Sequence, residues 1–164
     1  PEGGFVALHD DTPVGFGVGI FIDFDFDDPH HSLDDLIGEN SCGNHSADGD
    51  WYYGVTIAVD PAYRRLGIGQ QLYVLRKGVV QHYGKQGIVA GGVMPGYKDH
   101  LNDMSADEYV DRVCSGELYD PTLSFQIENG FEILGAIPDY MDDPAVGNNA
   151  ALIVWRNPDL AGAD

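Results

Sequence analysis

Basic residues are scarce in this sequence. Lys and Arg number 8 among 164 residues, against 27 Asp and Glu, and the formal net charge at pH 7 is −19. Proteins bind nucleic-acid phosphates and anionic membrane surfaces through clustered Lys and Arg side chains. The composition therefore argues against nucleic acid and against membrane as partners.

Cysteine and long apolar runs are also scarce. The two cysteines, Cys42 and Cys114, are too few for a disulfide framework. No apolar run approaches the roughly 20 residues that a membrane-spanning helix needs. We therefore interpret the chain as a cytoplasmic protein with reduced thiols.

The acidic excess consists mostly of aspartate, with 21 Asp and 6 Glu spread over the chain. One interpretation is a surface that attracts a cationic substrate. The other, which we favour, is a solvated surface suited to the salt-rich cytoplasm of a halophile, because high net charge keeps a protein soluble. The apolar fraction of 43% is that of a globular protein.

Hydrophobic patterning and turn residues predict an alternating series of strands and helices. A strand, a glycine-rich turn, a helix and a strand follow one another in the middle of the chain, which indicates a crossover between parallel strands. Hairpins on either side indicate antiparallel pairs. The fold class is therefore α/β, a mixed and mostly antiparallel sheet with helices on both faces. In chain order the expected elements are strands 5–9, 14–24 and 51–59, helix 70–83, strand 88–93, helices 106–115 and 122–129, and strands 131–137 and 150–156.

Several local signals support these elements. Residues 32–37 read as a short helical turn, capped by Ser32, in an otherwise irregular loop over residues 25–50. Ser105 and Glu108 have the spacing of a capping box, and Gly130 reads as a left-handed helix cap. Leu72, Leu75, Val79 and Val80 are expected on the buried face of helix 70–83. We expect residues 1–164 to form a single domain that lacks its N-terminal part, since strand-like sequence follows Pro1 almost at once.

The segment that carries chemistry is the turn Arg64-Arg-Leu-Gly-Ile-Gly69 between strand 51–59 and helix 70–83. Backbone N–H groups of residues 65–70 converge there at the positive end of a helix dipole, which makes an anion site. Gly67 and Gly69 permit positive φ and a close approach of a phosphate to the backbone. Arg64 and Arg65 add charge where a diphosphate needs it.

Other phosphate motifs fail on spacing. A Walker loop needs Lys and Ser or Thr after its last glycine, whereas Gln70 and Gln71 follow Gly69. The dinucleotide fingerprint needs a third glycine, and Leu72 stands in its place. A glycine-rich helix entry that binds nothing is the remaining alternative.

With these residues in this context, the chain resembles the GNAT superfamily of acyl-CoA-dependent N-acyltransferases. The family signature Arg/Gln-x-x-Gly-x-Gly/Ala is matched by residues 64–69, and residues 123–131 resemble the late helix and its Gly-Phe exit. Segments 89–97, 120–126 and 150–158 look like a subgroup sometimes fused ahead of a carbon–nitrogen hydrolase domain. The resemblance covers about residues 5–156.

The resemblance implies an N-acyltransferase that moves an acyl group, acetyl above all, from acyl-CoA to a primary amine by direct attack in a ternary complex. Acetyl-CoA is then the co-substrate, no metal is involved, and the partners are acyl-CoA and an amine, with a homodimer left open. The alternative is a non-catalytic acyl-CoA-binding module within a larger or fused protein. The implied CoA-binding residues are Ile57, Ala58 and Val59, which would pair with the pantetheine amides, and Arg64, Arg65, Leu66, Gly67, Ile68, Gly69 and Gln70, which would hold the pyrophosphate.

The chain departs from the family pattern in two ways. Family members usually begin with a strand and two helices that have no counterpart here. Gln126 stands where many members place a Tyr that protonates the departing thiolate. Tyr97 and Ser124 are the catalytic candidates for hydrogen bonding to the sulfur, although the favoured interpretation of Tyr97 is packing against the Pro95-Gly96 turn. Asp50, Tyr52 and Tyr53 are weaker candidates for the base, and a solvated acid with two core aromatics is the favoured interpretation.

Two metal motifs were also weighed. Cys42 and His45, with His30 and His31 nearby, have partial zinc spacing but lack a second pair. Residues 23–34 differ from a calcium loop at its sixth and twelfth positions. We therefore expect no metal site.

Overall fold

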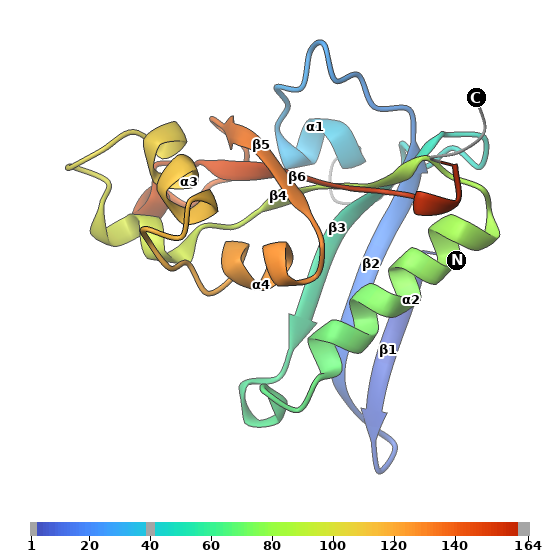
Figure 1. Ribbon diagram of the computed structural model, residues 1–164. Helices are drawn as coiled ribbons and strands as arrows, with labels where there is room; N and C mark the ends of the chain where they lie inside the picture. The colour runs from blue at the N-terminus through green and yellow to red at the C-terminus, as the bar shows by residue number, and fades with distance from the viewer. Residues whose placement is uncertain (1–2, 39–41, 161–164) are drawn as a thin grey trace. The chain divides into compact units, whose positions relative to one another are not determined.

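A computed structural model describes residues 3–38 and 42–160 of the chain (Figure 1). In that part, strands β1 to β6 are hydrogen-bonded in the order β1-β2-β3-β4-β6-β5. The chain divides into two compact units. Unit 1 comprises residues 1–24, 44–89 and 156–164, and unit 2 comprises residues 25–43 and 90–155. The expected mixed α/β sheet is confirmed, whereas the expectation for the start of the chain falls on residues 1–2, which lie outside the described part.

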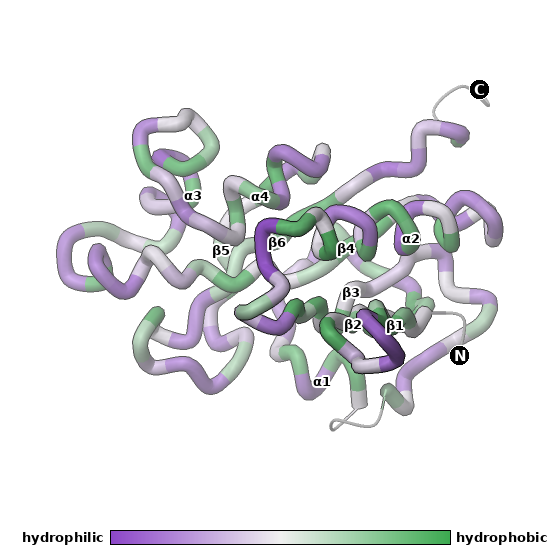
Figure 2. Tube along the Cα trace, turned by 90° about the horizontal axis from the view of Figure 1, so that it is seen from below, coloured by the Kyte–Doolittle hydropathy of each residue, from purple (hydrophilic) through white to green (hydrophobic). Residues whose placement is uncertain are grey.

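Unit 1 begins with a tight hairpin between β1 (Gly4–His9) and β2 (Thr12–Ile22). Its two turn residues, Asp10 and Asp11, have φ of 47° and 62°. Positive φ at both positions is the geometry whose twist matches that of the flanking strands, and Asp tolerates it better than most residues. The predicted turn was longer, but Thr12 and Pro13 already pair with β1. The turn is strongly polar, as the hydropathy colours of Figure 2 show.

The crossover in unit 1 follows the prediction. Strand β3 (Trp51–Val59) leads through a short 3-10 turn, η1 (Pro61–Tyr63), into helix α2 (Ile68–His82) and then into β4 (Gly87–Gly92). β3 pairs antiparallel with β2 and parallel with β4. The helix begins two residues earlier than predicted, because Gly67 rather than Gly69 is its N-cap.

Helix α2 packs on strands β1 to β3 with a face that differs from the predicted one. Leu72 and Val80 are buried as expected, but Leu75 is 47% exposed. Tyr73 and Arg76 take the remaining buried positions. Arg76 lies four residues from both Leu72 and Val80, so it occupies the centre of the buried stripe. A charged residue at a core position is the main surprise of this unit.

Unit 2 contains the remaining helices and the second antiparallel pair of strands. β5 (Glu132–Ile137) pairs with β6 (Ala150–Arg156), and the register shifts between Ile133 and Gly135. Helix α3 contacts both β5 and α4. The other elements are α1 (Leu33–Ile37), the 3-10 turns η2 (Pro95–Asp99) and η3 (Pro144–Val146), α3 (Ala106–Cys114) and α4 (Leu123–Glu128); η4 (Pro158–Leu160) belongs to unit 1.

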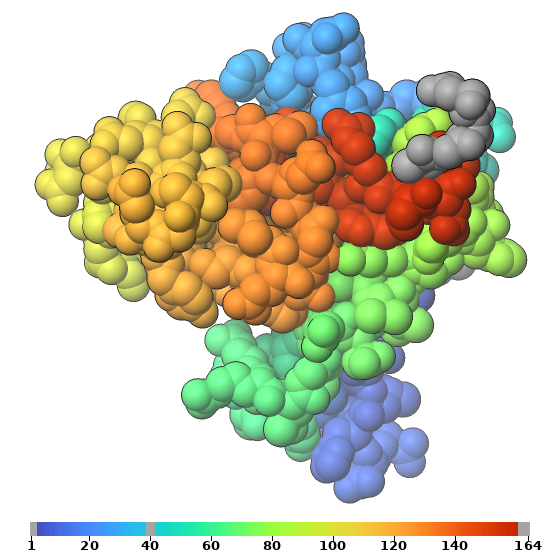
Figure 3. All heavy atoms as spheres, in the orientation of Figure 1, coloured from blue at the N-terminus to red at the C-terminus, as the bar shows by residue number. Residues whose placement is uncertain are grey.

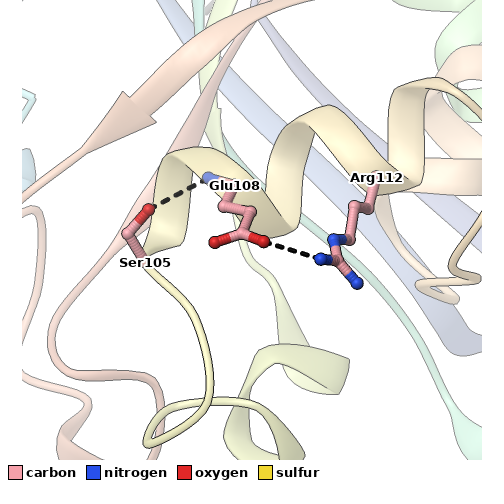
Figure 4. A network of polar contacts seen from close by, with 3 residues as sticks. All are labelled: Ser105, Glu108 and Arg112. Atoms are coloured by element: carbon pink, nitrogen blue, oxygen red, sulfur yellow. Dashed lines mark hydrogen bonds and ion pairs between the residues drawn. The ribbon is translucent and has the colours of Figure 1, made fainter.

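The predicted helix caps form, with one change. Ser32 and Ser105 accept hydrogen bonds from the N–H groups of Asp35 and Glu108, each at 3.1 Å. In a capping box the Glu108 carboxylate would accept from the Ser105 N–H. Here it accepts from Arg112 one turn later, at 2.7 Å, and forms an i, i+4 ion pair (Figure 4). Gly130 has φ of 79°, which confirms the left-handed cap after α4.

Two negative findings apply to residues 3–38 and 42–160. No helix there is long and apolar enough to cross a membrane. No group of three or more His, Cys, Asp or Glu side chains there is placed to hold a metal ion.

Candidate functional site

Strand β3 changes partners at a β-bulge. Val18 of β2 pairs with Thr56 and Gly19 pairs with Gly54, so Val55 is the extra residue in β3. Pairing with β4 covers Trp51, Tyr52 and Tyr53 and stops immediately before the bulge, whereas pairing with β2 continues to Val59. Beyond the bulge, one edge of β3 therefore has no β4 partner. Bulges re-aim a strand in this way and are frequent beside active sites.

Backbone alternation identifies the groups on that edge. The Asp60 N–H donates to the Val14 carbonyl at 2.9 Å, so the Val14–Asp60 pair is hydrogen-bonded across β2 and β3. Because hydrogen-bonded pairs alternate along antiparallel strands, Ala58 directs its backbone groups toward β2. Ile57 and Val59 direct theirs toward the opposite edge. Of the three strand residues implied to pair with a ligand, the outer two have the required orientation.

The turn after β3 is held in an unusual backbone conformation. Arg64 Nε donates to the Val59 carbonyl at 3.2 Å, and Asp60 Oδ1 accepts from the Ala62 N–H at 2.8 Å. Arg65 has φ of 61° and Gly67 has φ of 80°. Two left-handed residues separated by one position turn the chain sharply into α2. The turn lies at the surface, where Figure 3 shows it in teal green below the helix.

This turn presents backbone donors to solvent. The first N–H groups of an α-helix have no intrahelical acceptor, and the Gly67 cap of α2 contributes no side-chain hydrogen bond. Gly67 adopts the positive φ expected of it. Gly69 does not, since it lies in the first turn of α2, and Arg65 supplies the second left-handed position instead. The arrangement combines an α2 N-terminus with two exposed arginines, which suits an anion.

Tyr97 is buried in η2 of unit 2, and its hydroxyl is engaged. The Tyr97 O–H donates to the Met104 carbonyl at 3.0 Å, and its ring centroid lies 5.1 Å from that of Tyr109. Burial, with a smaller contribution from the Asp107 charge, raises the pKa of the Tyr97 hydroxyl. The packing role that the sequence left open is therefore fulfilled.

Ser124, the other catalytic candidate, belongs to a network around the fully buried carboxylate of Asp120. Asp120 Oδ2 accepts from Gly96 N–H and from Tyr109 O–H, each at 2.9 Å. Its Oδ1 accepts from the N–H groups of Thr122 and Leu123 at 2.8 and 3.0 Å. Ser124 Oγ accepts from the Asp120 N–H at 3.3 Å. The network ties η2, which carries Tyr97, to the start of α4, which carries Ser124.

Gln126 lies in α4 and is 5% exposed. Its Oε1 would stand 2.6 Å from a Cβ at Gly92, so a larger residue at the end of β4 would displace the Gln126 amide. The amide thus faces β4 directly within unit 2. Gln126 offers N–H donors but no titratable proton.

The base candidates behave as the favoured interpretation states. Asp50 is exposed, whereas Tyr52 and Tyr53 are fully buried core residues. The Tyr52 O–H donates to the Gly3 carbonyl at 2.8 Å, and burial raises its pKa. Neither tyrosine is placed to take a proton from a substrate in solution.

A cavity of about 270 Å³ lies in unit 2 beside β5. Asp107 is its one acidic lining residue, and Asp107 Oδ1 accepts the Ala136 N–H at 2.9 Å. The carboxylate therefore protects an edge-strand N–H group, a common device at sheet edges. The lining residues are Pro29, His30, Asp107, Leu134, Gly135, Ala136, Ile137 and Leu152.

Sequence comparisons agree with this geometry. The model of the Acetyltransferase (GNAT) family matches residues 1–88. The "Uncharacterized N-acetyltransferase YkwB" of Bacillus subtilis (strain 168) is 31% identical over 157 residues, covering 96% of this chain and 70% of that protein. The "Probable hydrolase YhcX" of the same organism is 38% identical over 160 residues, covering 97% of this chain. The chain spans 31% of the length of that hydrolase relative.

Two solved structures share the fold at 22% identity. The loading GNATL domain of CurA from Lyngbya majuscula has a TM-score of 0.83 and covers 97% of this chain and 78% of its own. The GphF GNAT-like decarboxylase in complex with isobutyryl-CoA has a TM-score of 0.76 and covers 94% and 78%.

The bulged strand, the left-handed turn and the arginines at the start of α2 form the candidate site of a GNAT-type acetyltransferase. The chain belongs to the Acetyltransferase (GNAT) family, and the predicted resemblance is confirmed.

Sequence reasoning missed two residues, Arg76 in unit 1 and Asp120 in unit 2. Asp120 begins segment 120–126, which resembles a GNAT subgroup, but nothing in the sequence shows that four donors converge on it. For Arg76 a signal was present. Its spacing from Leu72 and Val80 places a charge on the apolar stripe of α2.

Proposed function

We propose that the chain transfers an acyl group, acetyl above all, from acyl-CoA to a primary amine by direct attack in a ternary complex. The observation that carries the proposal is the β3 bulge followed by the Arg64–Gly69 turn. The first frees a strand edge, and the second supplies an anion site at the end of the same strand. An extended ligand with amides at one end and a diphosphate at the other matches both.

The CoA diphosphate would bind the N–H groups of residues 65–70, with the Arg64 and Arg65 guanidinium groups near it. Pantetheine amides would pair with β3 as an added strand. Ile57 and Val59 provide the outward backbone groups, and Ala58 lies between them. Arg64 Nε already holds the Val59 carbonyl, so the Val59 N–H and the Ile57 groups are the ones available.

The reaction needs a neutral amine and a polarised thioester. The amine nitrogen forms a bond to the carbonyl carbon, the oxygen takes the developing negative charge, and the C–S bond then breaks to release CoA thiolate. A backbone N–H of Ile57 or Val59 stabilises the oxyanion. The amine loses a proton to water, and the thiolate gains one. Because a thiol has a pKa near 8.5, the thiolate leaves readily without a dedicated acid.

The structure supports a limited role for the two side-chain candidates. The Asp120 network joins Ser124 to Gly96, the neighbour of Tyr97 in η2, and the Tyr97 hydroxyl donates to Met104. The Tyr97 hydroxyl has a single proton, which it donates to Met104, so we assign Tyr97 and Ser124 to shaping unit 2. Gln126, facing Gly92, can donate an amide N–H but cannot supply a proton.

A second candidate function is a non-catalytic acyl-CoA-binding module in a larger protein. Two observations favour it: the chain corresponds to 31% of the hydrolase relative, and a non-titratable Gln126 faces β4. In this case the bulge and the arginine turn bind acyl-CoA and no transfer follows.

One experiment distinguishes these functions. The protein is incubated with acetyl-CoA and a panel of primary amines, and thiol release is followed while CoA affinity is measured by calorimetry. Amine-dependent thiol release supports transfer. CoA binding without thiol release supports the binding module. Because one structural neighbour is a GNAT-like decarboxylase, a parallel reaction contains a carboxylated acyl-CoA and no amine and would reveal decarboxylation. The absence of CoA binding would contradict both candidates.

A further inference from the structure

Arg76 is a buried cation without an acidic partner. Its side chain is 2% exposed, and no carboxylate of the described residues lies within ion-pair distance of it. The chain has 27 acidic residues, so an ion pair was easily available. Burying an unpaired charge is costly unless other polar groups compensate for it. The groups that contact the guanidinium therefore indicate the role of Arg76.

The Arg76 guanidinium contacts the β-bulge. Its Nη2 donates to the Val18 carbonyl at 2.9 Å and also to the Thr56 carbonyl. The guanidinium carbon lies 5.7 Å from the Tyr52 ring centroid and 5.9 Å from that of Tyr73. Two carbonyl dipoles and two aromatic faces therefore compensate the charge in part, while the buried Nε has no hydrogen-bond partner among the described residues.

These two carbonyls belong to the residues that face each other at the register shift. A bulge leaves its extra residue unpaired and disrupts the ladder locally, so a donor from outside the sheet can bind the backbone beside it. Arg76 supplies a donor to both strands at once. It thereby holds the conformation at which β3 leaves β4.

The contact at Thr56 has a further consequence through the peptide bond. The Thr56 carbonyl and the Ile57 N–H belong to one planar trans peptide group, in which they point in opposite directions. By the alternation that directs Ala58 toward β2, the Thr56 carbonyl is also directed toward β2, where Arg76 binds it, so the Ile57 N–H points to the edge of β3 that has no β4 partner. A cation bound to the carbonyl polarises the peptide and strengthens the N–H as a donor, as in hydrogen-bond chains.

We propose that Arg76 is a positioning residue that orients and polarises the Thr56–Ile57 peptide, making the Ile57 N–H the donor to the thioester oxygen of acyl-CoA. This inference rests on the proposed function. It selects Ile57 over Val59, whose peptide partner, the Ala58 carbonyl, is directed toward β2 and has no cationic donor among the described residues. It also explains why a cation, rather than a neutral side chain, occupies the centre of the buried face.

The test compares Arg76→Met and Arg76→Lys with Arg156→Met in single-turnover and steady-state thiol release. Arg156 is a suitable control because it is exposed and lies over the Trp51 ring, at 5.9 Å, away from the bulge. We expect Arg76→Met to lower kcat about tenfold, less than the roughly 10²–10³ lost with a whole oxyanion donor. KM for acyl-CoA and CoA affinity should stay within about threefold. Arg76→Lys, which keeps the charge, should recover part of the loss.

A purely structural role predicts a different result. In that case Arg76→Met lowers the unfolding temperature, while kcat measured well below it equals that of wild type, and the proposal is wrong. If Arg76→Met does not fold, Arg76→Lys decides between the two by the same split of kcat and KM. Amide NMR gives a second readout: addition of a non-hydrolysable acyl-CoA analogue should move the Ile57 N–H resonance downfield, and less so in Arg76→Lys. If wild type binds the analogue and the Val59 resonance moves instead, the inference fails while the proposed function stands. If wild type binds no acyl-CoA, the proposed function fails and takes the inference with it.

Discussion

The carboxylate of Asp120 should be the most sensitive single group for the stability of unit 2. It is fully buried and accepts four hydrogen bonds, from Gly96 N–H, Tyr109 O–H, Thr122 N–H and Leu123 N–H. Asp120→Ala leaves all four donors without their acceptor. A buried donor left unsatisfied costs about 1–3 kcal/mol, but relaxation and water entry reduce the sum. We expect a loss of about 3–5 kcal/mol in the free energy of unfolding.

That loss is large against the roughly 5–15 kcal/mol by which domains are stable. For a chain of this size, about 1 kcal/mol corresponds to about 2–4 °C in Tm, so Asp120→Ala should melt about 6–20 °C lower. Asp120→Asn should lie between wild type and Ala, because an amide oxygen still accepts from the start of α4 but the NH2 group opposes the Gly96 N–H. The assay is thermal and urea unfolding followed by circular dichroism.

Asp111→Ala is the matched control, since Asp111 is an exposed aspartate on α3 in the same unit. Exposed substitutions usually change stability by less than about 0.5 kcal/mol. A loss below about 1 kcal/mol in Asp120→Ala would refute the reasoning, because it would mean that the four donors find other partners at little cost.

Three further predictions follow from the site. Gly67→Val should weaken CoA binding about tenfold or more by calorimetry, because φ of 80° disfavours a β-branched residue although a Cβ there meets open space. The control is Gly78→Ala, at a helical position that is equally open, and it should leave CoA binding unchanged. An effect of Gly67→Val below about twofold would contradict the assignment of this turn to phosphate binding. Tyr97→Phe and Ser124→Ala should each slow single-turnover thiol release by about tenfold or less, since the Tyr97 O–H donates to the Met104 carbonyl. A thousandfold loss in Tyr97→Phe with intact CoA affinity would show instead that Tyr97 is the general acid. Burial, with the Asp120 hydrogen bond and charge, raises the pKa of Tyr109 well above its usual range. The unfolded chain therefore releases the phenolic proton at lower pH than the folded chain, so the Tyr109 contribution to stability is complete below about pH 10 and is lost as pH rises further. Tyr109→Phe should make the free energy of unfolding fall less steeply at alkaline pH. An unchanged slope would count against the raised pKa of Tyr109.

Most of the fold was predictable because its signals are local. The crossover from β3 through α2 to β4, the Ser32 and Ser105 caps and the Gly130 cap depend on residues within a few positions of one another. Element bounds moved by one or two residues, as at the start of α2. That shift has a physical reason, since Arg65 tolerates a left-handed conformation that the sequence had assigned to Gly69.

The buried face of α2 shows where local reasoning ends. Leu75 and Arg76 are neighbours, and hydrophobicity alone assigns the buried position to Leu75. The structure buries Arg76 instead, because its guanidinium donates to the carbonyl groups of Val18 and Thr56 at the bulge. Hydrophobic periodicity along a helix carries no information about backbone carbonyls of another element that can accept hydrogen bonds from its side chains.

The sequence by itself determined the α/β fold class, the order of the elements and the position of the Arg64–Gly69 turn, since glycines, caps and arginines act through the backbone next to them. Only the tertiary structure decided the bulge in β3, the burial of Arg76 and the convergence of donors on Asp120. Those features join residues 58 positions apart at Val18 and Arg76 and 24 apart at Gly96 and Asp120. Strand register and the satisfaction of buried polar groups are set by such distant partners, and a linear pattern does not contain them.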